Sequence, residues 1–220
     1  MAGHALAVVE RDSTSDPSTG RVLTGSWLWD SSLVLAAHLA ADSRARRRLL
    51  GATVVELGAG STGLPGVAAV ACLGAARCAL TDMAALLPGL RANADANGMS
   101  AARADVRELR WGDRLQLEDN VFYDPEDMSA MAATLRGMWW TDEDEEGGGG
   151  GTVGWAASEV RDSVLDCMGV LREHGFEVAE VDRVTRPLLH HPGQTAAFAV
   201  YRVSLRQGNF LNNERGADFG

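Results

Sequence analysis

The stretch TVVELGAGSTGLPG, residues 53–66, decides the fold of this chain. A short β-branched run ends in a carboxylate, a glycine-rich turn follows, and the Ala- and Val-rich residues 64–73 have helical character. A G-x-G-x-x-G pattern in this strand–turn–helix order indicates a cofactor-binding loop, because glycines let the backbone turn sharply and approach a ligand closely. The sequence therefore predicts a strand over residues 52–57 and a ligand site at its carboxyl end.

Glu56 lies two residues before the first glycine of this loop. Dinucleotide-binding loops place their acidic residue about 20 positions further on, so the pattern differs from theirs. A carboxylate at the tip of the first strand suits a cationic part of a ligand, such as the amino group of S-adenosylmethionine (SAM). We therefore expect the backbone near Gly58 and Gly60 to approach the amino-acid part of SAM, with Glu56 shaping that end of the site.

Asp82 ends the second predicted strand, residues 77–81, and lies 24 positions after Gly58. Because neighbouring parallel strands end at the same edge of a sheet, this carboxylate is expected beside the glycine loop. Its two oxygens can accept hydrogen bonds from both ribose hydroxyls of SAM. Asp82 can also cap a helix predicted over residues 83–96, and the two roles are compatible.

Composition limits the class of protein. A chain of 220 residues with 46% hydrophobic residues can form one domain with a full core. Its net charge of −10 and pI of about 4.9 argue against a nucleic-acid partner and fit a basic protein partner. Three cysteines without metal-ligand spacing indicate free thiols. We expect no signal peptide and no membrane span, because no apolar stretch approaches about 20 residues.

Strands and helices alternate along the chain, which predicts an α/β fold with a parallel sheet covered by helices on both faces. The last two strands are expected to form an antiparallel hairpin at one edge. Further predicted strands cover residues 106–111, 152–157, 176–181 and 195–203, and further helices cover residues 31–41, 125–138 and 160–174.

We expect one folded domain over residues 21–205. Residues 1–20 and 206–220 are predicted to be flexible ends. Residues 141–151 are acidic and then glycine-rich, which predicts a disordered surface insertion because such a segment has nothing to bury.

Five blocks in matching order resemble the seven-β-strand SAM-dependent methyltransferases of the lysine-methyltransferase family 16 type. They are GSWLWDSSLVLA (25–36), the glycine loop (56–66), LTD (80–82), LRWGD (109–113) and VFYDPED (121–127). The resemblance implies a class I (Rossmann-like) fold, SAM as cofactor and methylation of a basic protein on an Arg or Lys side chain. It favours arginine, with histones among the expected substrates, and a location in cytoplasm, nucleus or both; we also expect a monomer.

Two tryptophans are further candidates at the site. Trp111 could pack near the adenine of SAM, and Trp29 could contact SAM or substrate, although each could equally be a core aromatic residue. His190 and His191 are adjacent in a predicted loop, but without nearby carboxylates or thiols we expect no metal site there.

The resemblance places the acceptor end at Asn120, Tyr123 and Asp124. A cationic acceptor favours carboxylates and aromatic faces, and a base must remove a proton from the attacking nitrogen. Relatives usually carry an acid where this chain has Asn120, and an Asn cannot accept a proton. The segment between Trp111 and Asn120 is also short and polar, so the central fourth strand of the sheet is either shortened (residues 114–121) or lost with impaired activity.

Alternative functions follow from these observations. The glycine loop alone would also fit an NAD(P)-dependent oxidoreductase, against which Glu56 and Pro65 argue. Asn120 and the short segment favour a catalytically weak SAM-binding or partner-binding module of the same fold. Methylation of a small molecule is a further alternative.

Overall fold

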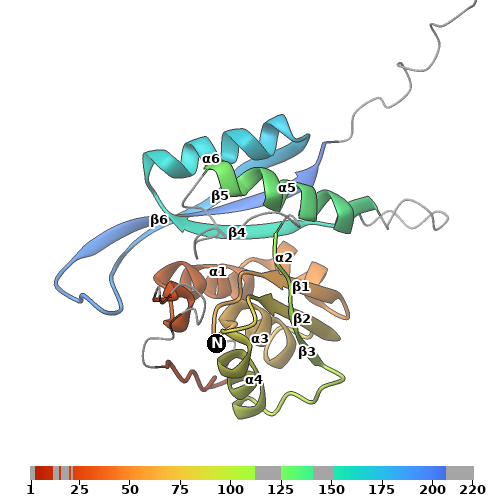
Figure 1. The fold of residues 1–220 in the computed structure, drawn as a ribbon, viewed down its shortest axis with the longest axis vertical. Helices are drawn as coiled ribbons and strands as arrows, with labels where there is room; N and C mark the ends of the chain where they lie inside the picture. Colours follow the sequence, from red (N-terminus) through yellow and green to blue (C-terminus); the bar gives the residue numbers. More distant parts are fainter. Residues whose placement is uncertain are drawn as a thin grey trace, which may run out of the picture.

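The computed structural model describes residues 3–11, 15, 20, 22–111, 125–140 and 151–206. Within these ranges the order of elements follows the predicted alternation (Figure 1). The strands are β1 (Thr53–Leu57), β2 (Arg77–Asp82), β3 (Ala104–Glu108), β4 (Gly154–Glu159), β5 (Phe176–Pro187) and β6 (Thr195–Leu205). The helices are η1 (Thr24–Ser26), α1 (Asp30–Ala41), α2 (Ser43–Leu49), α3 (Leu64–Ala71), α4 (Leu87–Ala96), α5 (Pro125–Trp140) and α6 (Asp162–Glu173).

The described strands form two three-stranded sheets. One is parallel, with the order β1-β2-β3, and the other is antiparallel, with the order β4-β6-β5. The α/β class and the antiparallel hairpin of the last two strands are confirmed. The single continuous sheet is not seen: among the described residues nothing pairs with the edge of β1 opposite β2. The break lies where a fourth strand was predicted to be shortened or lost, and residues 114–121 fall outside the described ranges.

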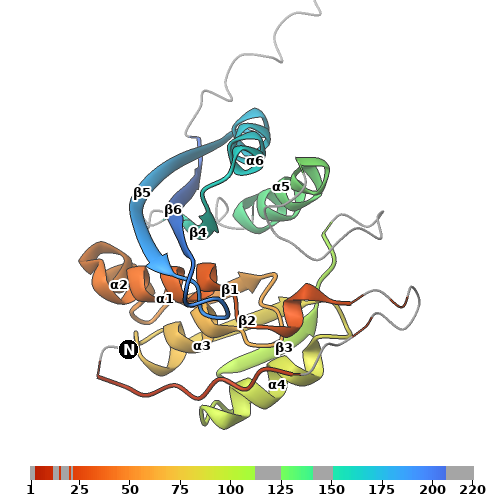
Figure 2. The same cartoon turned by 90° about the vertical axis from the view of Figure 1, so that its left-hand side faces the viewer.

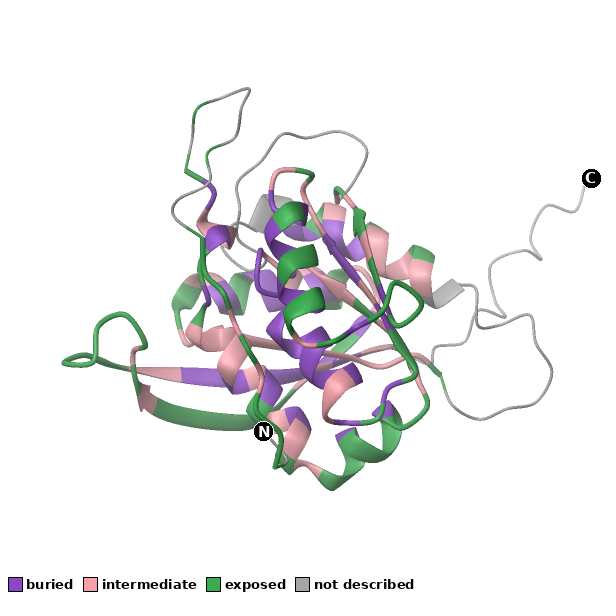
Figure 3. Ribbon diagram, turned by 90° about the horizontal axis from the view of Figure 1, so that it is seen from below, coloured by how far each residue is buried: buried purple, intermediate pink, exposed green. Residues whose placement is uncertain are grey.

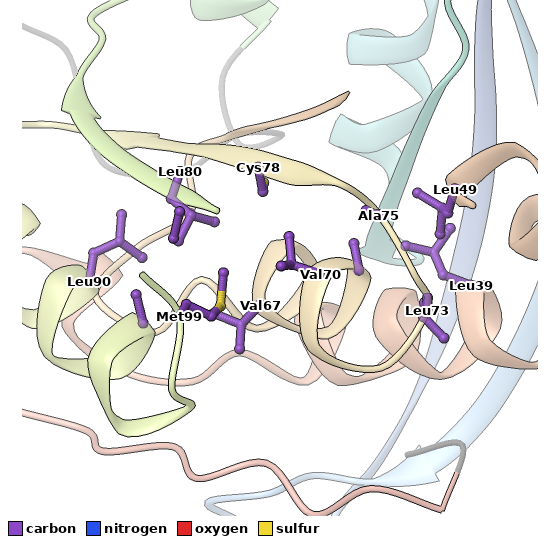
Figure 4. Packing of buried hydrophobic residues seen from close by; sticks show 14 of the residues in the cluster. Leu39, Leu49, Val67, Val70, Leu73, Ala75, Cys78, Leu80, Leu90 and Met99 are labelled. Carbon is purple, nitrogen blue, oxygen red and sulfur yellow. The ribbon is translucent and has the colours of Figure 1, made fainter. Parts of the chain in front are cut away.

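A first core lies between the parallel sheet and the helices α3 and α4. It joins Val67 and Val70 of α3 to Cys78 and Leu80 of β2, all of them buried (Figure 4). α1 packs against α3 and also against β4 and β6, so it holds the two sheets together.

A second core lies between the antiparallel sheet and the helices α5 and α6. Met128 of α5, Met168 of α6 and Phe176 of β5 have no exposed surface. The buried residues follow the inner faces of these elements and the exposed ones cover the outside (Figure 3). Taken over the two sheets, helices therefore cover both faces, with α1, α3 and α4 on one and α5 and α6 on the other (Figure 2).

The hairpin of β5 and β6 is longer than predicted. The sequence indicated strands over 176–181 and 195–203, whereas the two strands pair from Phe176↔Leu205 to Pro187↔Thr195. A register shift between Glu180 and Asp182 bends the ladder where it leaves the core. The distal residues are mostly exposed, so no apolar alternation marked them as a strand.

Helix α4 begins at Leu87, four residues later than predicted. A turn over residues 83–86 separates it from β2, and Pro88 falls in its first turn, where proline is favoured. Asp82 therefore does not cap this helix, and the helix-cap alternative for that residue is wrong.

Part of the chain assigned to the flexible N-terminus is held in place. The extended residues 4–11 run past α4 (Figure 2). Asn97 accepts from the Ala7 N–H at 3.0 Å and donates to the Ala7 carbonyl at 2.7 Å, and Asn93 accepts from the Val9 N–H at 2.8 Å. These hydrogen bonds from two asparagine side chains to the backbone hold residues 4–11 against α4. Local sequence patterns do not reveal such long-range bonds.

Candidate functional site

A cavity of about 1270 Å³ opens at the carboxyl ends of β1 and β2 and continues between β1 and β4. Helices α1, α3 and α5 contribute further walls. All the predicted cofactor residues line this one cavity: Trp29, Glu56, Gly58, Gly60, Asp82 and Trp111. The structure thus brings together residues from four separate segments of the sequence.

The glycine loop is closed on its outer side by the segment that precedes α1. Gly60 has a φ of +61°, and a Cβ built there would lie 2.8 Å from the carbonyl oxygen of Gly25. The same oxygen accepts the Ser61 N–H at 2.7 Å, and the Ser61 hydroxyl donates to the Ser26 carbonyl at 2.8 Å. The loop therefore requires glycine at position 60 for two reasons, its backbone conformation and the close approach of a second chain segment.

We expect Gly60→Ala to destabilise the protein by about 1–3 kcal/mol and to weaken SAM binding, because the side chain adds strain and pushes the loop from the Gly25 carbonyl. Gly98→Ala is the matched control, since Gly98 also has a positive φ (+67°) but nothing lies within 4 Å of its Cβ position. Thermal unfolding and calorimetric SAM titration measure both effects. Equal SAM affinities in the two variants would contradict the proposed loop contact.

Asp82 links the glycine loop to the second strand. Its Oδ2 accepts the Gly60 N–H at 2.7 Å and its Oδ1 accepts the Met83 N–H at 2.7 Å. Both carboxylate oxygens are acceptors of the kind that the hydroxyl groups of a ligand need. The predicted bidentate geometry is therefore compatible with this arrangement.

Glu56 connects β1 to the first turn of α3. Its Oε2 accepts the Gly66 N–H at 2.7 Å, one of the helix N–H groups that lack a partner within the helix. The residue is half-buried, and its carboxyl group is the shielded part. Burial raises the pKa of the Glu56 carboxyl to about 8, the Gly66 hydrogen bond opposes the rise, and the charge of Asp82 adds to it. A cationic ligand group in the cavity would favour the ionised form.

Asn93 supports the glycine loop from behind the site, and the sequence analysis missed it. Its side-chain amide donates to the carbonyl oxygens of Ser61, Val9 and Gly89 at 2.9, 2.9 and 3.2 Å, and only 1% of the residue is exposed. Asn93, on α4, therefore connects residues 4–11 to the glycine loop by hydrogen bonds. Asn93 and Asn97 are four residues apart among alanines, so both lie on one helical face, and this spacing could have indicated that they bind a neighbouring segment.

We expect Asn93→Ala to lower the free energy of unfolding by about 2–3 kcal/mol, because several buried backbone groups lose their partner. Asn97→Ala, at a half-buried position on the same helix face, is the matched control with an expected loss below about 1.5 kcal/mol. Urea unfolding compares the two. A larger loss for the Asn97 variant would contradict the central role of Asn93.

The sequence matches the model of a family described as lysine methyltransferase over residues 14–132, more than half of the chain. This chain belongs to that family. The match spans the glycine loop, Asp82 and Trp111, all of which line the cavity. SAM is therefore the cofactor, and the family is the one that the five sequence blocks indicated.

Solved structures support the same fold. One is a Pyrococcus horikoshii protein provisionally assigned as an RNA methyltransferase, with a TM-score of 0.55, 15% identity and coverage of 82% of this chain and 84% of that one. Precorrin-6y C5,15-methyltransferase from Geobacter metallireducens gives a TM-score of 0.46 and 14% identity, with coverage of 79% of this chain and 87% of that one. The O-methyltransferase NcsB1, solved with SAM, gives a TM-score of 0.45 and 18% identity, with coverage of 79% of this chain and 56% of that one. At 15% identity the first likeness shows the class I methyltransferase fold.

The chemistry of the cavity walls fits SAM. The glycine loop lines the cavity at Gly58 and Gly60, which lack side chains that would keep a ligand from the backbone. Asp82 supplies acceptors for hydroxyl groups, and Glu56 supplies a carboxyl group for an ammonium. When bound, SAM supplies the methyl group on a sulfonium.

Two tryptophans lie at the mouth of the cavity. Trp27 and Trp29 are 38% and 40% exposed, and the Trp29 indole N–H donates to the Thr24 carbonyl at 3.0 Å. Trp29 thus lies at the surface of the site rather than in the core, so the core-aromatic alternative is wrong. Trp111 is half-buried. It packs against the second core and also lines the cavity, so it has both of the expected positions.

The β5–β6 loop folds over this mouth. The Asp30 carboxylate accepts the Leu189 N–H at 3.1–3.2 Å and pairs with Arg186 at 3.4 Å. His190 Nε2 lies 3.2 Å from a carboxylate oxygen of Glu10 and 3.3 Å from the Leu28 carbonyl. His190 is therefore part of a contact between distant segments of the chain.

The acceptor candidates Asn120, Tyr123 and Asp124 lie outside the described residues and stay predictions. Among the residues that the structure describes, no group of three or more His, Cys, Asp or Glu side chains could hold a metal ion. None of the described helices is both long and apolar enough to cross a bilayer.

Proposed function

We propose that this chain transfers a methyl group from SAM to a side-chain nitrogen of a basic protein. The observation that carries the proposal is the convergence of the predicted cofactor residues on one cavity, in a member of the lysine methyltransferase family. Family membership also favours SAM over the NAD(P) alternative.

Methyl transfer from a sulfonium is a direct displacement, so the protein must align the two reactants, exclude water and accept a proton from the nitrogen. The glycine loop, with Asp82 and Glu56, is proposed to hold the donor at the carboxyl edge of β1. Asn120, Tyr123 and Asp124 remain the residues proposed for the acceptor. Because an Asn can orient an amine but cannot take its proton, the proton must leave through another group or water.

The charge and shape of the cavity mouth support a cationic acceptor. The whole chain carries a net charge of −10, which attracts basic partners at long range. Trp27 and Trp29 present aromatic surface at the mouth, where a cation can lie over a ring face. Glu10 adds a partly exposed carboxylate beside the same opening.

The choice between lysine and arginine follows from resemblance. The family is described as lysine methyltransferase. The chain most resembles methyltransferase-like protein 23, with residues 121–127 as the most diagnostic block, and this resemblance favours arginine. We propose arginine first, with histones among the substrates, and a monomer acting in cytoplasm, nucleus or both.

The test is methyl transfer from isotope-labelled SAM to basic peptides that differ in having arginine or lysine, read by mass spectrometry. We expect label on the arginine peptides. Transfer to lysine peptides alone would correct the acceptor, and transfer to nucleic acid or a small molecule alone would overturn the protein substrate.

The second candidate function is a SAM-binding module with weak catalysis. It is supported by Asn120 and by the break between the two sheets. Tight SAM binding in calorimetry, together with no transfer to any peptide, would identify it.

A further inference from the structure

Three segments that are far apart in the sequence meet at one carboxylate beside the mouth of the cavity. Glu10 Oε1 accepts the Leu28 N–H at 2.7 Å and lies 3.2 Å from His190 Nε2. The same ring nitrogen lies 3.3 Å from the Leu28 carbonyl oxygen. Residues 4–11, the segment before α1 and the β5–β6 loop are therefore joined at His190, which lines the cavity.

These contacts determine which nitrogen of the His190 ring carries the hydrogen. Both partners of Nε2, a carboxylate oxygen and a carbonyl oxygen, can only accept hydrogen bonds. Nε2 must therefore donate, and in the neutral ring the lone pair is left on Nδ1. A carboxylate that binds one ring nitrogen and leaves the other as a base is the arrangement of general-base histidines.

His190 also lies close to the proposed position of the acceptor. Its backbone contact is with Leu28, the residue between Trp27 and Trp29, whose ring faces are proposed to receive a cation. The same segment reaches the glycine loop, because the Gly25 carbonyl accepts an N–H of that loop at 2.7 Å. The His190 side chain is 49% exposed, so a substrate and water can both reach it.

We propose that His190 accepts the proton that the acceptor nitrogen loses during methyl transfer, and that Glu10 positions its ring. This inference rests on the proposed function, and it supplies the proton acceptor that Asn120 cannot be. As the nitrogen–carbon bond forms, the carbon–sulfur bond breaks and its electron pair stays on sulfur. The proton of the nitrogen passes to Nδ1 of His190, the Glu10 carboxylate stabilises the imidazolium, and the exposed ring releases the proton to water.

The rate of methyl transfer should therefore depend on the ionisation of His190. The other charged or titratable groups of the elements that meet here are Glu10, Asp30 of α1, Arg186 of β5 and His191. The rate should rise with pH as the His190 ring loses its proton, because only the neutral ring can accept one. This part of the pH profile should be absent in His190→Gln, since glutamine does not titrate.

The first test measures transfer from isotope-labelled SAM to an arginine peptide. His190→Gln keeps an N–H donor for Leu28 and Glu10 but has no base, so the rate should fall by about 100-fold or more. SAM affinity in calorimetry should stay within about twofold, because no proposed SAM contact is changed. His174→Gln is the matched control: His174 follows the end of α6 and does not line the cavity, so the wild-type rate is expected.

Glu10→Gln tests the positioning role separately. The amide oxygen can still accept the Leu28 N–H, but it brings no charge to stabilise the imidazolium. The rate should fall by about three- to tenfold, less than for His190→Gln, because the pair is partly exposed and water screens it. The loss should appear in kcat with the KM of the peptide unchanged. A wild-type kcat would overturn the role of Glu10.

The state of the ring gives a readout that needs no turnover. Nitrogen NMR of protein labelled at its five histidines should show the neutral His190 ring with hydrogen on Nε2 and none on Nδ1. The spectrum of His190→Gln identifies the signal. Hydrogen on Nδ1 of the neutral ring would overturn the proposal, because that nitrogen could not then accept a proton.

The rate measurements can overturn the proposal in three further ways. An unchanged rate in His190→Gln, or an equal loss in His174→Gln, would remove the role of His190 as the base. A loss of SAM affinity as large as the loss of rate would assign His190 to cofactor binding instead. No transfer by the wild type would overturn the proposed function together with this inference, whereas transfer that His190→Gln leaves intact overturns this inference alone.

Discussion

Replacing Asp82 with alanine is expected to weaken SAM binding by about 100-fold or more. The carboxylate accepts short hydrogen bonds from the backbone N–H groups of Gly60 and Met83, and it is proposed to accept the ribose hydroxyls as well. Hydrogen bonds to a charged group contribute about 1.5–3 kcal/mol each, and about 1.4 kcal/mol is tenfold in affinity. Calorimetric titration with SAM measures the change.

Two further variants separate the ligand contact from a general loss of folding. Asp82→Asn keeps the shape but brings an NH₂ group, which cannot accept, next to a backbone donor, so it should also bind SAM weakly. Asp95→Ala, at an exposed position of α4, should bind as the wild type does. Wild-type affinity in Asp82→Ala, with the fold retained by circular dichroism, would show that the cofactor is bound elsewhere.

The raised pKa of Glu56 makes stability fall as the pH rises. The carboxyl group has a pKa of about 8 in the folded protein, against an ordinary value of 4.5. Between these values the unfolded chain has released the proton and the folded chain has kept it, so protonation favours the folded state. The folding free energy contributed by this group is therefore present at low pH and decreases by up to about 1.4 kcal/mol per pH unit until the pH passes about 8.

Glu56→Gln should remove this dependence. The glutamine carbonyl can still accept the Gly66 N–H, and it stays neutral at every pH. We expect the wild type to lose about 3–4 kcal/mol more than the variant between pH 5 and pH 8, measured by urea unfolding at each pH. Glu177→Gln, at an exposed position of β5, is the control and should follow the wild type. Parallel curves for the wild type and the Glu56 variant would show that the carboxyl group is ionised in the folded state.

Ligand binding adds a second measurement on the same residue. If Glu56 receives the ammonium of the ligand, the ionised carboxylate binds it better, so affinity should rise with pH up to about 8. S-adenosylhomocysteine, which carries the same amino-acid part and has no methyl to transfer, is a suitable probe. The rise should be absent in Glu56→Gln.

The site was predictable where its residues lie next to a strand or a loop with a recognisable pattern. The glycine pattern, the carboxylate of Glu56 before it and the position of Asp82 at the end of β2 are local features, because parallel strands end at one edge of the sheet. The surface position of Trp29 was not predictable, because an aromatic residue beside a helix start packs inward or outward according to what lies above it. Here the β5–β6 loop lies above it and is held by Asp30.

The sequence by itself determined the α/β class, the cofactor loop, the family and the place where the described strands divide into two sheets. The tertiary structure decided what these features contact. Asn93 joins Val9, 84 positions away, to the glycine loop, and the Glu56 carboxylate is bound by the start of α3 rather than left free for a ligand alone. β1 and β4, separated by about half of the chain, line the same cavity. The physical reason is the distance along the chain over which each interaction acts. Local spacing determines turns and periodicity, whereas burial and hydrogen-bond partners depend on segments that meet only when the chain has folded.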